Sequence, residues 1–143
     1  MGTIDTSSWK LVGETSNAHF FEVESHVLAA VAIAGSSDDA TTAVDNAAFH
    51  KRYFNDHGRG VLLVFTDTGK SQDAGARAVY SRAMIPQVYC AVAYVGGSAL
   101  TRAAASFLIA FAGLKIPAKW FTKLEDALPW ARERLAEPAA SEM

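Results

Sequence analysis

An apolar run from Gly60 to Phe65, followed by a polar turn and a segment of helical composition, constrains the fold of this chain most strongly. The run reads Gly-Val-Leu-Leu-Val-Phe and carries no polar residue on either of the two faces that alternate along a strand. A strand that is apolar on both faces is covered on both faces, so we expect it in the middle of a sheet. The loop that leaves the carboxyl end of such a strand is where open α/β sheets place their binding groups. Residues 67–75 are therefore the first candidate for a functional surface.

Further strand and helix patterns surround this central strand. Phe21 and Val23 alternate with Glu22 and Glu24, which is typical of a half-exposed strand. Strands that alternate with helices predict right-handed crossovers and parallel pairing, whereas the first strands form an antiparallel hairpin or meander. The predicted fold class is α/β, a four- to five-stranded mixed sheet flanked by four helices. We expect strands at 9–15, 19–24, 27–34, 61–66, 88–95 and 116–121, and helices at 39–55, 72–83, 99–112 and 122–135.

Two of these helices have recognisable start signals. Ser36 to Asp39 is a cluster of helix-capping residues, and Thr122 and Glu125 have the spacing of a capping box. Pro129 falls inside the last helix and is expected to kink it or divide it in two. The inner face of the first helix is expected to hold Ala40, Ala43, Val44, Ala47, Ala48, Tyr53 and Phe54.

Composition limits the class of protein. A length of 143 residues predicts a single domain at 1–143, with its core at about 20–136 and a flexible tail at 137–143. The net charge of −2 does not indicate nucleic-acid binding, which is typical of positively charged domains. The longest apolar stretch, 103–114, is too short to span a bilayer, so we expect no integral membrane segment. The single Cys90 excludes an internal disulfide and, without a secretory leader at the start, favours a cytoplasmic location.

No motif in the sequence predicts catalysis. Gly69-Lys70-Ser71 resembles the end of a phosphate-binding loop, but such a loop needs glycine where this chain has Val64. The four histidines, at 19, 26, 50 and 57, share no ligand spacing with Cys90 or with one another. No serine stands in a Gly-x-Ser-x-Gly nucleophile turn. We therefore expect no catalytic residue, no metal, no cofactor and no enzymatic activity.

Residues 20–135 resemble the SpoIIAA-like branch of the STAS superfamily, small bacterial domains also grouped as STAS/CRAL-TRIO-like. The most specific match is Ile116-Pro-Ala-Lys-Trp-Phe-Thr122 followed by Asp126-Ala-Leu-Pro-Trp130. The segment from Gly97 to Leu108, with Ser98 and Arg102, matches more permissively. The resemblance implies a mixed sheet flanked by helices and a non-enzymatic regulatory or protein-binding role in signalling.

The resemblance also implies where a protein partner would dock. In STAS anti-sigma-factor antagonists, the loop after the central strand carries Asp-Ser-Ser-Gly, and its first serine is phosphorylated. Gln72-Asp-Ala-Gly75 stands there in this chain, so the phospho-acceptor position holds Asp73, which a serine kinase cannot modify. Ser71, two residues earlier, stays open as a phosphorylation site. The expected partner-binding residues are Asp67, Thr68, Ser71, Gln72, Asp73 and Gly75.

An alternative function is the binding of an apolar small molecule or lipid. Phe107, Phe111, Trp120, Phe121 and Trp130 either form plain core or line a cleft between the C-terminal helices and the sheet, as the resemblance to CRAL-TRIO lipid carriers suggests. The turn before Ser98 could hold an anion at a helix start, with Arg102 one turn further. The alternative ligand residues are Ser98, Arg102, Phe107, Phe111 and Trp120. The sequence leaves open whether the chain forms a homodimer.

Overall fold

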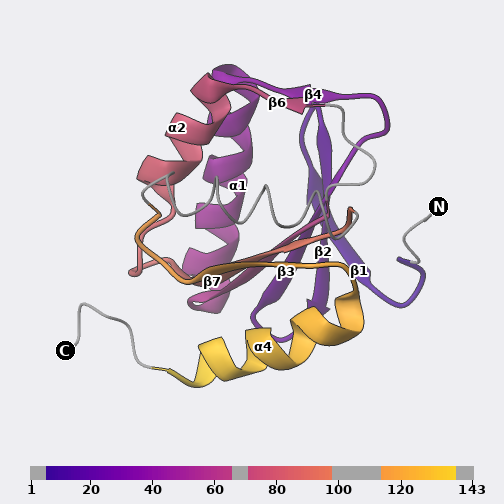
Figure 1. The fold of residues 1–143 in the computed structure, drawn as a ribbon, viewed down its shortest axis with the longest axis vertical. Coiled ribbons are helices and arrows are strands. Elements are labelled where there is room, and N and C mark those ends of the chain that lie inside the picture. The colour runs from indigo at the N-terminus through magenta and orange to yellow at the C-terminus, as the bar shows by residue number, and fades with distance from the viewer. Residues whose placement is uncertain (1–5, 66–70, 98–113, 138–143) are drawn as a thin grey trace.

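The computed structural model describes residues 6–65, 71–97 and 114–137 (Figure 1). Its main sheet has six strands in the order β1-β2-β3-β5-β7-β8, rather than the four or five predicted. The β1/β2 and β2/β3 pairs are antiparallel, and β3/β5, β5/β7 and β7/β8 are parallel, so the mixed sheet was predicted correctly. The strands are β1 (Lys10–Glu14), β2 (Ala18–Glu24), β3 (Val27–Ala32), β5 (Gly60–Phe65), β7 (Tyr89–Val95) and β8 (Ala118–Phe121).

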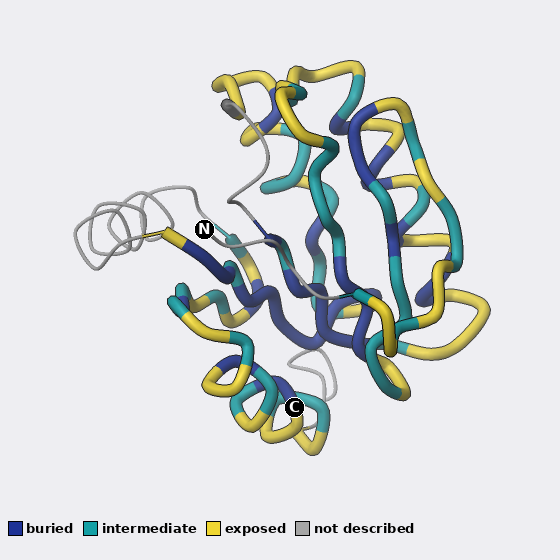
Figure 2. Tube along the Cα trace, turned by 90° about the vertical axis from the view of Figure 1, so that its right-hand side faces the viewer, coloured by how far each residue is buried: buried dark blue, intermediate teal, exposed yellow. Residues whose placement is uncertain are grey.

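The central position of β5 is confirmed. It lies between β3 and β7 and is parallel to both. Val61, Leu62 and Leu63 are each 0% exposed. Gly60 lets the strand start against its neighbour, since a Cβ atom there would lie 2.4 Å from the backbone oxygen of His26. Figure 2 shows that burial is concentrated in the middle strands and falls off toward the outer faces of the helices.

Helices cover both faces of the sheet. Helices α1 (Ala40–His57) and α2 (Ala74–Ala83) lie on one face, and α4 (Leu124–Ala136) lies on the other (Figure 1). Because side chains alternate along a strand, Leu62 packs with α1 and α2, whereas Leu63 packs with α4. The described residues contain these three helices, and the helix predicted at 99–112 falls outside them.

The buried face of α1 differs from the predicted one. Val44 is 56% exposed, and Ala40 and Ala48 are exposed as well. Asn46 and His50 are buried in their place, at 5% and 2% exposed. The prediction was wrong because it assigned the inner face by apolarity, whereas hydrogen bonds to the amide of Asn46 and to the Nδ1 of His50 hold these two polar side chains inside the core.

Helix α4 starts and continues differently from the prediction. Its N-cap is Lys123 without a side-chain hydrogen bond, so the predicted capping box is absent. The helix runs through Pro129 as one element, because Pro129 stands on an exposed side and its ring removes a single backbone donor. Two hydrogen bonds from Arg132 to the carboxylate of Glu24, at 2.9 and 2.7 Å, connect α4 to β2. Among the described residues, no helix combines the length and the apolarity that crossing a membrane requires.

Two short strands form a second, separate sheet at one end of the main sheet. Strands β4 (Ser37–Asp38) and β6 (Ser71–Gln72) pair in parallel beyond the carboxyl ends of β3 and β5. The backbone N–H of Asp73 continues this ladder by donating to the oxygen of Asp38 at 3.1 Å. The ladder brings the first turns of α1 and α2 together, so that a Cβ atom on Gly75 would lie 3.3 Å from the Cβ of Ala40.

Candidate functional site

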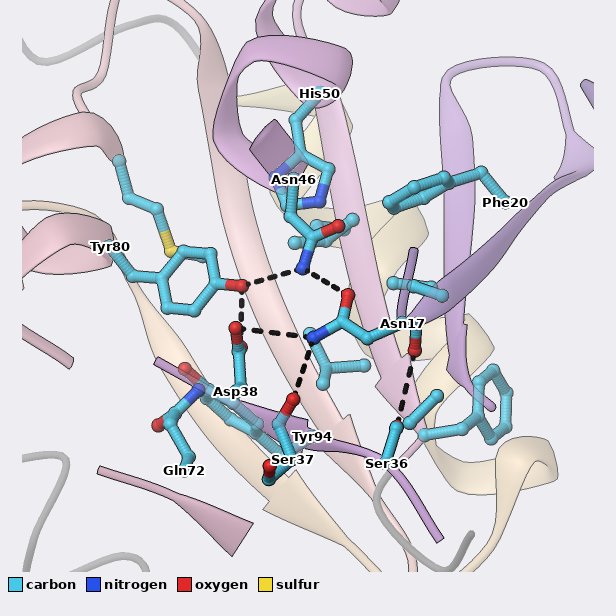
Figure 3. Close-up of a pocket in the computed structure, with 17 residues that line it drawn as sticks. Asn17, Phe20, Ser36, Ser37, Asp38, Asn46, His50, Gln72, Tyr80 and Tyr94 are labelled. Atoms are coloured by element: carbon cyan, nitrogen blue, oxygen red, sulfur yellow. Dashed lines mark hydrogen bonds between the residues drawn. The ribbon is translucent and has the colours of Figure 1, made fainter. Parts of the chain in front are cut away.

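A cavity of about 100 Å³ lies between the main sheet and helices α1 and α2, with β4 and β6 at its outer end (Figure 3). Its position beyond the carboxyl ends of parallel strands is where open α/β sheets bind ligands. One part of the wall is apolar and the other is polar. The apolar part includes Phe20, Ala30, Leu62, Val64 and Met84, and the polar part includes Asn17, Asp38, Asn46, His50 and Tyr80.

Asp38 is the acceptor at the centre of the polar wall. Its Oδ2 accepts from the hydroxyl of Tyr80 at 2.6 Å. Its Oδ1 accepts from the hydroxyl of Thr42 at 2.5 Å and from the Nδ2 of Asn17 at 3.4 Å. The β4–β6 ladder fixes the backbone of Asp38, so the carboxylate holds α1, α2 and the β1–β2 turn at once.

Two buried asparagines complete this network. Asn46 donates to the Oδ1 of Asn17 and to the hydroxyl oxygen of Tyr80, both at 3.0 Å, and accepts from Thr15 at 2.6 Å. Asn17 also donates to the backbone oxygen of Ser37 at 3.1 Å. These contacts assign the orientation of both amides and use both of their donor hydrogens. All four amide hydrogens are therefore used within the network.

The tyrosines of the cavity remain neutral. Burial, followed by the hydrogen bond to Asp38, raises the pKa of Tyr80 far above its usual value. Burial also raises the pKa of Tyr94, which lines the cavity, to about 12. Both phenols keep their hydrogen at physiological pH, and neither is a base.

His50 occupies the deepest polar position. It is 2% exposed, and its ring packs edge-on against Phe20 and Tyr89 with centroid distances of 5.3 and 5.9 Å. Its Nδ1 lies 3.0 Å from the hydroxyl of Tyr89, while its Nε2 has no hydrogen-bond partner among the described residues. Burial lowers the pKa of His50 to about 3, so the imidazole is neutral.

The predicted docking residues lie beside the outer end of the cavity. Gln72 is exposed on β6, and Ser71 precedes it there. Asp73 is exposed and caps α2, accepting from the backbone N–H of Ala76 at 2.9 Å. Gly75 is exposed in the first turn of that helix. Asp67 and Thr68 lie outside the described residues.

The residues of the alternative ligand site are only partly described. Trp120 lies on β8 and stacks on Tyr94 at 5.2 Å between ring centroids, so it supports the cavity wall from behind. Phe121 and Trp130 pack against each other in the core beneath α4, at 5.6 Å. Ser98, Arg102, Phe107 and Phe111 lie outside the described residues.

The sequence analysis missed most of the cavity wall. Asn17, Asn46 and Tyr80 were not singled out, and His50 was considered only as a metal ligand. The spacing of Asn46 and His50, four residues apart on one helix face, is the signal that could have indicated a polar patch beneath α1. Among the described residues, no three histidine, cysteine or acidic side chains lie close enough to hold a metal ion. Cys90 is buried, and burial raises the pKa of its thiol.

Replacing Tyr80 by phenylalanine is expected to lower the free energy of unfolding by about 1–3 kcal/mol. The change keeps the ring but leaves a donor of buried Asn46 without its acceptor and removes a donor from Asp38. Urea unfolding at pH 7 measures the loss. Ser36→Ala is the matched control, because it also deletes a hydroxyl, but one whose bond to the Asn17 oxygen is 3.4 Å long. Equal effects of the two variants would contradict the importance of the network.

The comparisons with known proteins agree with this fold. The sequence model of a family described as a domain of unknown function, DUF7793, matches residues 21–134. Among solved structures, this chain is similar to an uncharacterised DUF3478-family protein with a SpoIIAA-like fold from Shewanella loihica PV-4. The TM-score is 0.58 at 17% sequence identity, covering 83% of this chain and 99% of that one. No curated protein matches. The SpoIIAA-like fold implied by the sequence is thereby confirmed.

Proposed function

This chain belongs to the DUF7793 family, and we propose that it is a non-enzymatic STAS-type module that docks a protein partner through the start of α2. The docking surface consists of exposed residues of β6 and the first turns of α1 and α2, namely Ala40, Val44, Gln72, Asp73, Ala74, Gly75 and Ala78. A SpoIIAA-like fold supports this proposal, because the segment after its central strand is the one that STAS proteins use.

The observation that carries the proposal is the exposed carboxylate of Asp73 at the start of α2. Its hydrogen bond to the Ala76 N–H fixes the side chain, which the sequence resemblance assigns to the position of the phosphoserine in STAS antagonists. A fixed carboxylate presents a permanent negative charge, so docking would need no kinase. Asp39 caps the adjacent helix α1, and the backbone hydrogen bond from Thr42 lowers the pKa of its carboxyl.

The surroundings of Asp73 suit a contact surface. Ala74, Gly75 and Ala78 are exposed on α2 and have little side-chain entropy to lose on binding. Val44, four residues after Ala40 and therefore on the same side of α1, is 56% exposed. Small apolar side chains beside two carboxylates fit a protein partner that presents a basic residue at the edge of an apolar patch.

Ala78→Arg is expected to abolish partner binding without changing the fold. Arginine is nearly as good a helix former as alanine, and at this exposed position it places a bulky cation on the docking surface. Ala136→Arg makes the same change at an exposed position of α4, which covers the opposite face of the sheet. The measurement is quantitative affinity enrichment from the native cell after crosslinking, with wild type and both variants compared. A protein enriched by wild type and Ala136→Arg but not by Ala78→Arg would support the proposal.

Asp73→Asn tests the charge separately. Asparagine caps a helix as well as aspartate does, so stability should be unchanged while partner binding weakens about threefold to tenfold. Asp73→Ala should lower stability by about 1 kcal/mol through loss of the cap.

In the enrichment experiment, the proposed docking role is wrong if wild type and Ala78→Arg enrich the same proteins, or if wild type enriches none. Enrichment of a second copy of this chain would show that the partner is the same protein and that the complex is a homodimer.

A further inference from the structure

We propose that the cavity beneath α1 and α2 binds a small neutral molecule that has one acceptor oxygen on an apolar body of a few carbon atoms, such as a ketone or an ester. The oxygen would take the hydrogen bond that His50 leaves unmade, and the carbon body would lie against Phe20, Leu62 and Met84. The inference concerns the interior of the molecule and does not depend on partner docking at its surface.

The polar wall limits where a ligand can be recognised. Asn17 and Asn46 each use both amide hydrogens within the network, and the Tyr80 hydroxyl both donates and accepts. A ligand could compete for these groups only by breaking bonds that already hold three elements together. His50 is different, because it is part of the same wall and its Nε2 has no partner among the described residues. An unmade hydrogen bond on a buried ring is a functional signal, since buried polar atoms are nearly always paired.

The contact with Tyr89 assigns the hydrogen on His50. The Tyr89 hydroxyl is buried, and its hydrogen-bond partner among the described residues is the Nδ1 of His50. If Nδ1 were the donor, both the hydroxyl hydrogen of Tyr89 and the lone pair of Nε2 would be buried and unpaired among the described residues, whereas donation by Tyr89 leaves only the Nε2–H group unpaired. We therefore assign Tyr89 as the donor and Nε2 as the protonated ring nitrogen. His50 thus offers an N–H group, which requires an acceptor on the ligand.

Size and charge narrow the ligand class further. A cavity of roughly 150 Å³ accepts benzene, so about 100 Å³ with an outer end at β4 and β6 suits a molecule of similar or smaller size. A lipid chain needs the several hundred Å³ typical of ligand pockets. An anion would lie near the carboxylate of Asp38, and an ammonium cation would offer no acceptor to the His50 N–H group. A neutral molecule is the remaining class.

The experiment is an NMR titration of the purified chain, labelled with nitrogen-15, with cyclobutanone and with methylenecyclobutane, which are both smaller than benzene. The two probes have nearly the same shape, but only the ketone has an acceptor oxygen. We expect saturable shifts at Phe20, Asn46 and Met84 with both probes. We expect the His50 Nε2–H signal to move with the ketone alone, and the ketone to bind about tenfold tighter. Equal affinities, or no saturable shifts in these residues, would overturn the proposal.

Three variants and a third probe complete the test. Ala30→Leu fills the cavity and should abolish binding of both probes, whereas Ala48→Leu makes the same change on the exposed side of α1 and should leave binding unchanged. His50→Phe keeps an aromatic ring and should remove the preference for the ketone. If that variant does not fold, the ratio of the wild-type affinities for the ketone and the alkene still tests whether a hydrogen bond to the ligand oxygen forms. Octanoate should not bind, and tighter binding of octanoate than of cyclobutanone would point to a lipid chain and contradict the ligand class.

Discussion

Replacing Leu63 by alanine is expected to lower the free energy of unfolding by about 3–5 kcal/mol, which is a large share of the stability of a domain this size. Leu63 is 0% exposed in the central strand and belongs to the cluster that joins the sheet to Ala127 and Ala131 of α4. Its removal takes away buried apolar surface and leaves a cavity that a parallel strand, held by hydrogen bonds on both sides, cannot collapse to fill.

Leu11→Ala is the matched control for this prediction. It makes the same chemical change on β1, where the side chain is 56% exposed. The expected loss there is within about 0.5 kcal/mol. Urea unfolding followed by circular dichroism gives both values from the shift in midpoint at constant slope. A loss below about 1 kcal/mol for Leu63→Ala would mean that β5 is not the centre of the core.

The central strand could be predicted because its signal is local. Six consecutive residues without a polar side chain require cover on both faces, whatever the rest of the chain does. The β4–β6 ladder could not be predicted in the same way. Each of its strands has two residues, and Ser37 pairs with Ser71 across 34 positions of the sequence, so neither segment carries a pattern of its own. The same ladder explains why residues expected to be a simple capping cluster hold two helix starts together.

The two candidate sites differ in the same way, because one is formed by a single stretch of sequence and the other by separate segments. Gln72, Asp73 and Gly75 could be proposed from the sequence because they follow the central strand directly. The cavity depends on side chains from separate segments that meet only in the folded chain, including Asn17 before β2, Asp38 on β4 and Tyr80 on α2. A polar residue in a sequence is normally expected to be exposed. Its burial becomes favourable only when the fold supplies hydrogen-bond partners, which the sequence pattern does not show. The apolar stripe of α1 was therefore assigned without Asn46 and His50.

His50 is expected to dominate the loss of stability in mild acid. Burial lowers its pKa in the folded chain to about 3, from an ordinary value of 6.5, so between these values the unfolded chain binds the extra proton. The stabilising contribution is present above pH 6.5 and is lost as pH falls toward 3, at about 1.4 kcal/mol per pH unit. From pH 6.5 to 4.5 the expected loss is about 2 kcal/mol, because the slope reaches its full value only below pH 6.5. Among the described residues, the aromatic rings that pack against His50 belong to Phe20, Tyr80 and Tyr89, and none of them titrates in this range.

Between pH 6.5 and 4.5, the contribution of His50 to the pH dependence of stability can be separated from that of the carboxylates. Hydrogen bonds lower the pKa values of Glu24 and Asp39 from 4.5 and 3.8, so the stability that these groups contribute is lost at more acidic pH. His50→Gln places a neutral amide in the same position, which lowers stability at pH 7 but removes the buried base. Urea unfolding at half-unit intervals should therefore give the variant a much flatter dependence on pH than wild type. Equal slopes for the two proteins would show that His50 takes up a proton over the same pH range in the folded and the unfolded chain, and would contradict the lowered pKa of the buried ring.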